Sequence, residues 1–129
     1  MTLALGPTAT YASAVWPERR LNVAAPGTPP LWVAGIDERT AAMVHVEWIA
    51  DPATSPLVQS SAAPDAVRRA AVIDLVVLFG RYREVLDDAG NPLTAVRIIT
   101  NDAAAVPFLS WVCEQSRCRG AVEVQQGRG

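Results

Sequence analysis

Four short segments in the first third of the chain carry the pattern of β-strands. They are TYASAVW (10–16), RLNVAA (20–25), LWVAGI (31–36) and AMVHVEWIA (42–50). Each is rich in β-branched, aromatic or other apolar residues and is bounded by turn residues, which is typical of half-buried strands. In the fourth segment Met43, His45, Glu47 and Ile49 share one face. The alternation predicts that one face packs while the other meets solvent or a partner chain.

A helical period replaces this alternation after a loop at 51–64, in which PLVQS is a candidate short strand. The helix is expected from Asp65 to about Asp88, because apolar side chains recur there at helical spacing. These side chains are Val67, Ala71, Leu75, Leu78, Tyr82, Val85 and Leu86. Asp74 falls between two of them, which predicts a carboxylate paired with an arginine in the core or facing a subunit interface.

The remaining segments alternate strand and helix patterns. TAVRIIT (94–100) predicts a strand, DAAAVPFLSWVCEQ (102–115) a helix that Pro107 shortens or kinks, and GAVEVQQ (120–126) a closing strand. Thr100, Asn101 and Asp102 are expected to end a core strand and to cap the next helix. The order is β-β-β-β-(β)-α-β-α-β. It predicts an α+β fold, and 129 residues fit a single domain at 1–129.

Composition narrows the function classes. All 11 basic residues are arginine and the chain has no lysine, which excludes a lysine Schiff base and a P-loop lysine. The arginines are scattered among 13 acidic residues at a net charge of -2, a balance that disfavours nucleic-acid binding. No apolar run approaches the ~20 residues that span a bilayer, and the N-terminus lacks a basic region. A cytoplasmic protein without membrane contact is therefore expected.

The candidate metal ligands are few. Cys113 and Cys118 are the only cysteines and do not form a CxxC motif, so two reduced thiols are expected. His45 is the only histidine, and no cysteine or histidine lies at metal-ligand spacing around it. The sequence therefore predicts no metal site.

Five segments, taken in order, resemble one known family. TYASAV is similar to a YSxAV motif, LWVAGI to an hhhSGQh strand, and CRGAVEV to a closing ARTxVEV. Between them, DPATSPLV resembles the loop after the SGQ strand, and YREVLDDAGNPLTAVRIITND resembles a central helix, AG turn and strand. On these segments the chain is identified as a divergent member of the RidA/YjgF family of enamine/imine deaminases.

This resemblance implies a fold, an assembly and an activity. The fold would be chorismate-mutase-like (RidA-like), with a mixed sheet backed by two helices. The chain would form a homotrimer with clefts between subunits, and its ligand would be a small carboxylate or imine compound. It would hydrolyse reactive enamines and imines to carbonyl compounds and ammonia without a cofactor.

The resemblance also implies candidate site residues, in two alternative registers. If CRGAVEV is the arginine strand of the family, Arg119 holds the substrate carboxylate, and the glutamate strand is either missing or supplied by the inserted segment, in which Glu47 would activate water. If it is the last strand, Glu123 positions the water. The implied substrate-binding residues are Tyr11, Ala34, Gly35 and Arg119.

Two further hypotheses remain open. Ala34 stands where the family has serine, and one C-terminal strand is missing, which favours a catalytically altered trimeric binding or scaffolding protein of the same fold. RIITND after a helix also resembles an RNase H-like nuclease, with Asp37, Asp74 and Asp102 as candidate metal ligands. A deaminase assay separates the first two hypotheses, and Mg²⁺-dependent cleavage of an RNA/DNA hybrid supports the third.

Overall fold

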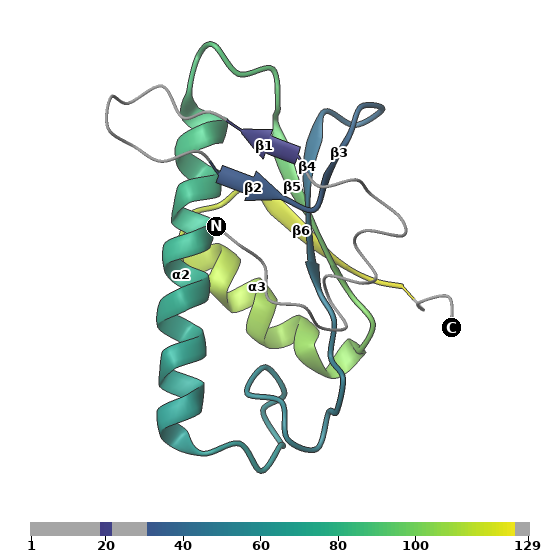
Figure 1. Ribbon diagram of the computed structural model, residues 1–129, viewed down its shortest axis with the longest axis vertical. Coiled ribbons are helices and arrows are strands. Elements are labelled where there is room, and N and C mark those ends of the chain that lie inside the picture. Colours follow the sequence, from purple (N-terminus) through teal and green to yellow (C-terminus); the bar gives the residue numbers. More distant parts are fainter. Residues whose placement is uncertain (1–18, 22–30, 126–129) are drawn as a thin grey trace.

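The computed structural model describes residues 19–21 and 31–125, and Figure 1 shows their arrangement. The elements in chain order are β1 (Arg19–Leu21), β2 (Leu31–Val33), β3 (Gly35–Asp37), β4 (Ala42–Glu47), α2 (Asp65–Asp87), β5 (Ala95–Thr100), the 3-10 helix η1 (Ala103–Ala105), α3 (Val106–Gln115) and β6 (Gly120–Val124). The predicted α+β class, with a mixed sheet and two helices, is confirmed for the described residues.

The strands form a small sheet and a larger one. β1 pairs with β2 antiparallel, and the larger sheet has the order β3-β4-β5-β6. In the larger sheet β3 is antiparallel to β4, whereas β4, β5 and β6 are parallel. Parallel neighbours need a crossover connection, which here contains α2 between β4 and β5 and α3 between β5 and β6.

Both helices pack on one face of the larger sheet. The main buried cluster joins Met43 and Ile98 of the sheet to Phe79 and Tyr82 of α2 and to Leu109 of α3. A second cluster comprises Ala34, Val44, Val46 and Ile99. Because successive residues of a strand point to opposite faces, the two clusters lie on opposite sides of the sheet.

The structure at the end of β5 tests the expectation that Thr100, Asn101 and Asp102 end a core strand and cap the next helix. Thr100 is fully buried, and the Asp102 side chain accepts a hydrogen bond of 2.9 Å from the backbone N–H of Ala104 at the start of η1. This strand end and helix cap are therefore confirmed. Pro107 lies in the first turn of α3, where a proline needs no N–H partner, so it marks the start of that helix and does not kink it.

Two predicted strands need correction, and a third lies outside the described residues. LWVAGI is divided into β2 and β3, which belong to different sheets. PLVQS forms turns and no strand, because its backbone groups bond within the loop, as with the Val58 N–H to the Ser55 carbonyl. TYASAVW lies outside the described residues.

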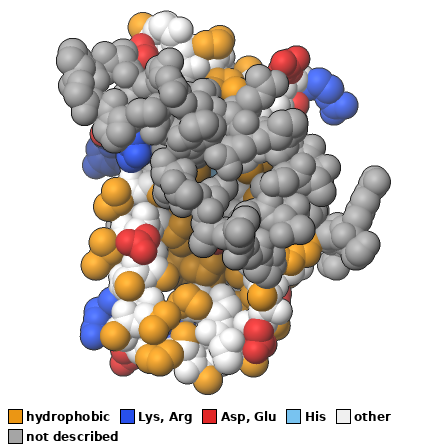
Figure 2. Space-filling model, viewed as in Figure 1, with side chains coloured by type: hydrophobic (Ala, Val, Ile, Leu, Met, Phe, Trp, Pro, Cys, Tyr) orange, Lys and Arg blue, Asp and Glu red, His pale blue; other side chains and the backbone are white. Residues whose placement is uncertain are grey.

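Two residues expected on the buried face of α2 are exposed; the core ion pair of Asp74 is therefore wrong, and its place at a subunit interface stays an untested prediction. Asp74 is exposed, because it precedes the core residue Leu75 by about 100° of helical rotation. Val67 is 47% exposed, and Ile73 and Val77 further along the helix are 62% and 60% exposed. Figure 1 shows that the first turns of α2 reach past the end of the sheet. Figure 2 shows hydrophobic side chains at the surface along this flank. No helix among the described residues is long and apolar enough to cross a membrane.

Candidate active site

A buried histidine links α2 to the end of β4. His45 is 7% exposed, and its ring packs edge-on against Phe79 with the ring centres 5.1 Å apart. Its Nδ1 lies 2.7 Å from the hydroxyl oxygen of Tyr82, and its Nε2 lies 2.8 Å from Oε1 of Glu47. The three side chains form a continuous hydrogen-bonded chain from the core to the strand end.

The partners of His45 favour one tautomer of its neutral ring. An ionised carboxylate only accepts hydrogen bonds, so Nε2 carries the hydrogen that is donated to Glu47. In the neutral ring Nδ1 then accepts from the Tyr82 hydroxyl. Burial, followed by the nearby charge of Glu47, raises the pKa of Tyr82 far above its usual range. The phenol therefore stays protonated and able to donate.

Glu47 lines a surface cleft with a volume of about 510 Å³. The cleft lies between the end of β4, the loop that follows it and the side of α2. Its polar lining residues are Glu47, Asp51, Thr54, Ser55 and Asp74, and its apolar ones include Ile49, Leu57 and Leu75. Parallel strands commonly present ligand sites beyond their carboxyl ends. The cleft occupies that position on β4.

Side chains from other elements hold the loop that walls this cleft. The Asn101 side chain accepts a hydrogen bond of 2.6 Å from the Ile49 N–H and donates one of 2.9 Å to the Ile49 carbonyl. The Arg68 guanidinium donates to four loop carbonyls, those of Val58, Gln59, Ser61 and Ala63. Such contacts satisfy backbone groups that no strand pairs, so they give the wall a defined shape.

The carboxylates of the cleft do not form a metal site. Asp51 is held in a local turn, where it accepts from the Ala53 N–H at 3.0 Å and from the Thr54 hydroxyl at 3.3 Å. Across residues 19–21 and 31–125, no three His, Cys, Asp or Glu side chains converge closely enough to hold a metal ion. The residues present do not fit the metal-ion clamp that many nucleases use.

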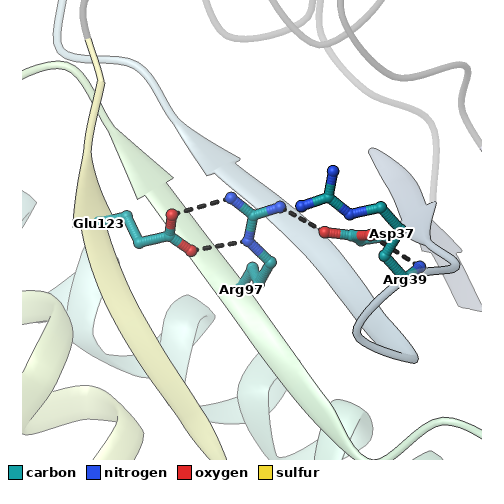
Figure 3. Close-up of polar contacts among 4 residues, drawn as sticks. All are labelled: Asp37, Arg39, Arg97 and Glu123. Atoms are coloured by element: carbon teal, nitrogen blue, oxygen red, sulfur yellow. Dashed lines mark hydrogen bonds and ion pairs between the residues drawn. The ribbon is translucent and has the colours of Figure 1, made fainter.

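A second polar cluster spans three strands on the opposite face of the sheet (Figure 3). Arg97 on β5 donates two parallel hydrogen bonds to Glu123 on β6, at 2.7 and 2.8 Å. Its remaining terminal nitrogen bonds to Asp37 at the end of β3, at 2.6 Å, and Asp37 also accepts from the Arg39 N–H at 3.0 Å. We call Asp37, Arg97 and Glu123 the strand-bridging triad.

The triad shifts the pKa values of its members in the directions expected for ion pairs. The hydrogen bonds from Arg97 lower the pKa of Glu123 and outweigh the opposing effect of burial. At Asp37 burial tends to raise the pKa, but hydrogen bonds from Arg97 and the Arg39 N–H hold it below its usual value. The Glu123 contact raises the pKa of Arg97 further above its already high range. All three groups are therefore charged at neutral pH.

These shifts predict a loss of stability in acid. A carboxyl whose pKa is lower in the folded state stabilises the fold above its unfolded pKa, near 4 to 4.5, and loses that contribution as the pH falls through the lower folded value. We expect the melting temperature to fall from pH 5 downward, and to fall less steeply in Glu123→Gln. Thermal unfolding from pH 7 to 2.5 measures both, and equal slopes for the two proteins would contradict the role assigned to Glu123.

The structure separates the residues that sequence reasoning grouped into one site. Arg119, 52% exposed at its side chain, pairs with Asp87 at 2.9 Å and precedes β6, whereas Glu47 ends β4. Because β4 and β6 run parallel, these positions lie about 16 Å apart along the strands. Glu123 is bound in the triad, on the other face from Glu47. Ala34 and Gly35 lie at the β2–β3 junction, and Tyr11 lies outside the described residues.

The three aspartates of the nuclease hypothesis do not meet either. Asp37 belongs to the triad, Asp74 lines the cleft, and Asp102 caps η1. Sequence reasoning missed the polar roles of Tyr82 and Arg97. The helical pattern treats Tyr82 only as an apolar position, although its spacing of three residues places it on the same helix face as Phe79.

Comparison with known proteins gives the family. A model of restriction endonuclease fold toxin 2 matches residues 11–119. No curated protein and no solved structure matches the chain. The predicted RidA/YjgF membership, the imine deaminase activity and the chorismate-mutase-like fold drawn from it are not supported; the first two are wrong. The homotrimer and the small carboxylate ligand stay untested predictions. The chain belongs to the restriction endonuclease fold toxin 2 family.

Proposed function

We propose that this chain is a nuclease that hydrolyses phosphodiester bonds of nucleic acid in the cleft at the carboxyl end of β4. The observation that carries the proposal is the hydrogen-bonded chain from Tyr82 through His45 to Glu47, which places an oriented carboxylate on the cleft wall. Membership of a family described by an endonuclease fold and by toxin action supports phosphodiester hydrolysis as the reaction class.

Glu47 takes the role of general base. In phosphodiester hydrolysis a water loses a proton as it attacks phosphorus, and the bond from phosphorus to the leaving sugar oxygen breaks. A carboxylate within hydrogen-bond reach can accept the proton of the water, and the leaving oxygen takes a proton from solvent. His45 binds Oε1 of Glu47, so we assign proton abstraction to the second oxygen, Oε2. The water would stand in the cleft, between Glu47 and the bound phosphate.

His45 and Tyr82 act as positioning residues. The Tyr82 hydroxyl occupies Nδ1, and this keeps the hydrogen of the neutral ring on Nε2, directed at Glu47. A carboxylate held by a buried donor loses fewer orientations when it meets the water. In this mechanism Glu47 touches the water, and His45 and Tyr82 hold Glu47 in position.

The nuclease class was one of the alternatives drawn from the sequence, but with a different set of residues. That hypothesis used Asp37, Asp74 and Asp102 as metal ligands, and only Asp74 lies at the cleft. The expectation that the chain binds no nucleic acid rested on its scattered arginines. The proposal replaces that expectation, and a direct cleavage assay decides between them.

The test uses the whole chain with end-labelled single-stranded DNA, double-stranded DNA and RNA. Each polymer is incubated once with Mg²⁺ and once with a chelator, and fragments are resolved by length. We expect cleavage of at least one polymer, at a rate proportional to protein concentration. Intact polymers under both conditions, with protein that is folded by circular dichroism, would overturn the proposal.

A further inference from the structure

The two cysteines meet across the end of α3 because of how that helix terminates. Arg117 has a φ of 55°. Its N–H bonds to the Glu114 carbonyl at 3.1 Å, and the Cys118 N–H bonds to the Cys113 carbonyl at 3.0 Å. A left-handed residue with these two bonds is the Schellman motif. In that motif the side chains three residues before and two residues after the helix end face each other, and here both are cysteines.

Further contacts place the thiols together. The Cys113 thiol donates a hydrogen bond of 3.0 Å to the Cys118 carbonyl oxygen. Gly120 makes room for them, because a side-chain carbon there would lie 3.2 Å from Cys113 Sγ and 3.0 Å from the Val96 carbonyl. The backbone at the end of α3 and the absence of a side chain at Gly120 therefore hold the two thiols side by side.

The pair is also reachable from solvent. Cys113 and Cys118 are only 6% and 8% exposed, yet both line a surface hollow of about 450 Å³ together with Arg117 and Glu114. A hydrogen bond from the Cys118 thiol lowers the pKa of Cys113, whereas the same bond and burial raise that of Cys118. Cys113 is thus the thiol that ionises first, and the thiolate is the reactive form.

We propose that Cys113 and Cys118 are a redox-active pair that small-molecule disulfides convert to an intramolecular disulfide. The Cys113 thiolate attacks one sulfur of the small disulfide, whose S–S bond breaks and releases one thiolate. Cys118 then loses its proton to solvent and attacks Cys113 Sγ in the mixed disulfide, releasing the second thiolate. Two protein thiols are oxidised and one small disulfide is reduced to two thiols.

Oxidised glutathione is the probe for this pair. The folded chain is incubated with it and quenched in acid. Remaining thiols are then alkylated in denaturant, and the mass is measured. We expect a monomer that has lost two hydrogen atoms and carries no alkyl group. Two alkylated thiols, or a stable glutathione adduct on the unmodified sequence, would overturn the proposal.

Single variants separate the two steps. Cys118→Ser should stop at a glutathione adduct on Cys113, because no second thiol resolves it. Cys113→Ser should react more slowly by roughly tenfold or more, because burial still raises the pKa of the remaining thiol, Cys118. Equal adduct rates in the two variants would contradict the assignment of Cys113 as the attacking group.

Two variants of Arg117 test the role of the helix end itself. Arg117→Gly and Arg117→Val both remove the guanidinium, but only glycine adopts a positive φ without strain. Disulfide formation should match the original rate with glycine and be slower with valine, and equal rates would contradict the geometric argument.

The disulfide should also raise the melting temperature of the protein by about 5 °C. A melting temperature below that of the reduced protein would show that the folded geometry cannot hold the bond.

Discussion

Glu47→Gln is expected to lower the rate of nucleic-acid cleavage by a factor on the order of 100 or more, with little change in the melting temperature. Glutamine keeps the size of the side chain, and its amide oxygen still accepts the hydrogen bond from Nε2 of His45. It cannot accept a proton from water at any working pH. The substitution therefore removes the proposed chemistry and leaves the packing of His45 against Phe79 in place.

Glu84→Gln is the matched control for this experiment. Glu84 is exposed on α2 and does not line the cleft, and its substitution changes the net charge of the protein by the same amount. It should cleave at the original rate, so that any general effect of charge on binding an anionic polymer is subtracted. A Glu47→Gln protein that cleaves as fast as Glu84→Gln would remove Glu47 from the mechanism.

The sequence pattern was sufficient for most of the described architecture. A helix expected from Asp65 to about Asp88 is found at Asp65–Asp87, because its apolar residues keep a helical period over six turns. The strand ending at Thr100 and the cap at Asp102 also follow from local chemistry. The split of 31–36 between two sheets could not be predicted, because it depends on pairing with distant strands rather than on local propensity.

The candidate site was accessible to sequence reasoning only in part. The spacing of His45 and Glu47 placed both on one strand face, as the structure confirms through their contact. Their third partner, Tyr82, lies 37 residues away, and no pattern within a strand or helix encodes that contact. No local pattern indicates the role of Arg97, because its partners lie on the neighbouring strand β6 and, across β4, on β3.

The mistaken family shows why short motifs need an independent check. CRGAVEV and YREVLDDAGNPLTAVRIITND resemble RidA motifs, but the similar positions mainly reflect a turn followed by a strand. Turns favour glycine and asparagine, and strands favour valine and isoleucine, in unrelated folds. A match across residues 11–119 weighs more because it spans helices, strands and loops together.

Removing the central arginine of the strand-bridging triad should cause a large loss of stability. Arg97→Leu is expected to lower the free energy of unfolding by about 2 kcal/mol, a value below that of a fully buried pair because the Arg97 side chain is 25% exposed. The reason is that the substitution removes the bidentate bond to Glu123 and leaves two carboxylates without their shared cation. Urea unfolding at pH 7 measures the change.

Neutralising those carboxylates tests the cause. In a protein with Arg97→Leu, Asp37→Asn and Glu123→Gln together, no unpaired charge remains, so part of the lost stability should return. The single variant should also recover relative to the original protein as the pH falls, because its carboxyls, freed from the arginine, take up protons at a higher pH than those of the intact triad. A triple variant no more stable than Arg97→Leu would mean that the aliphatic stem of Arg97, and not its charge, holds the three strands together.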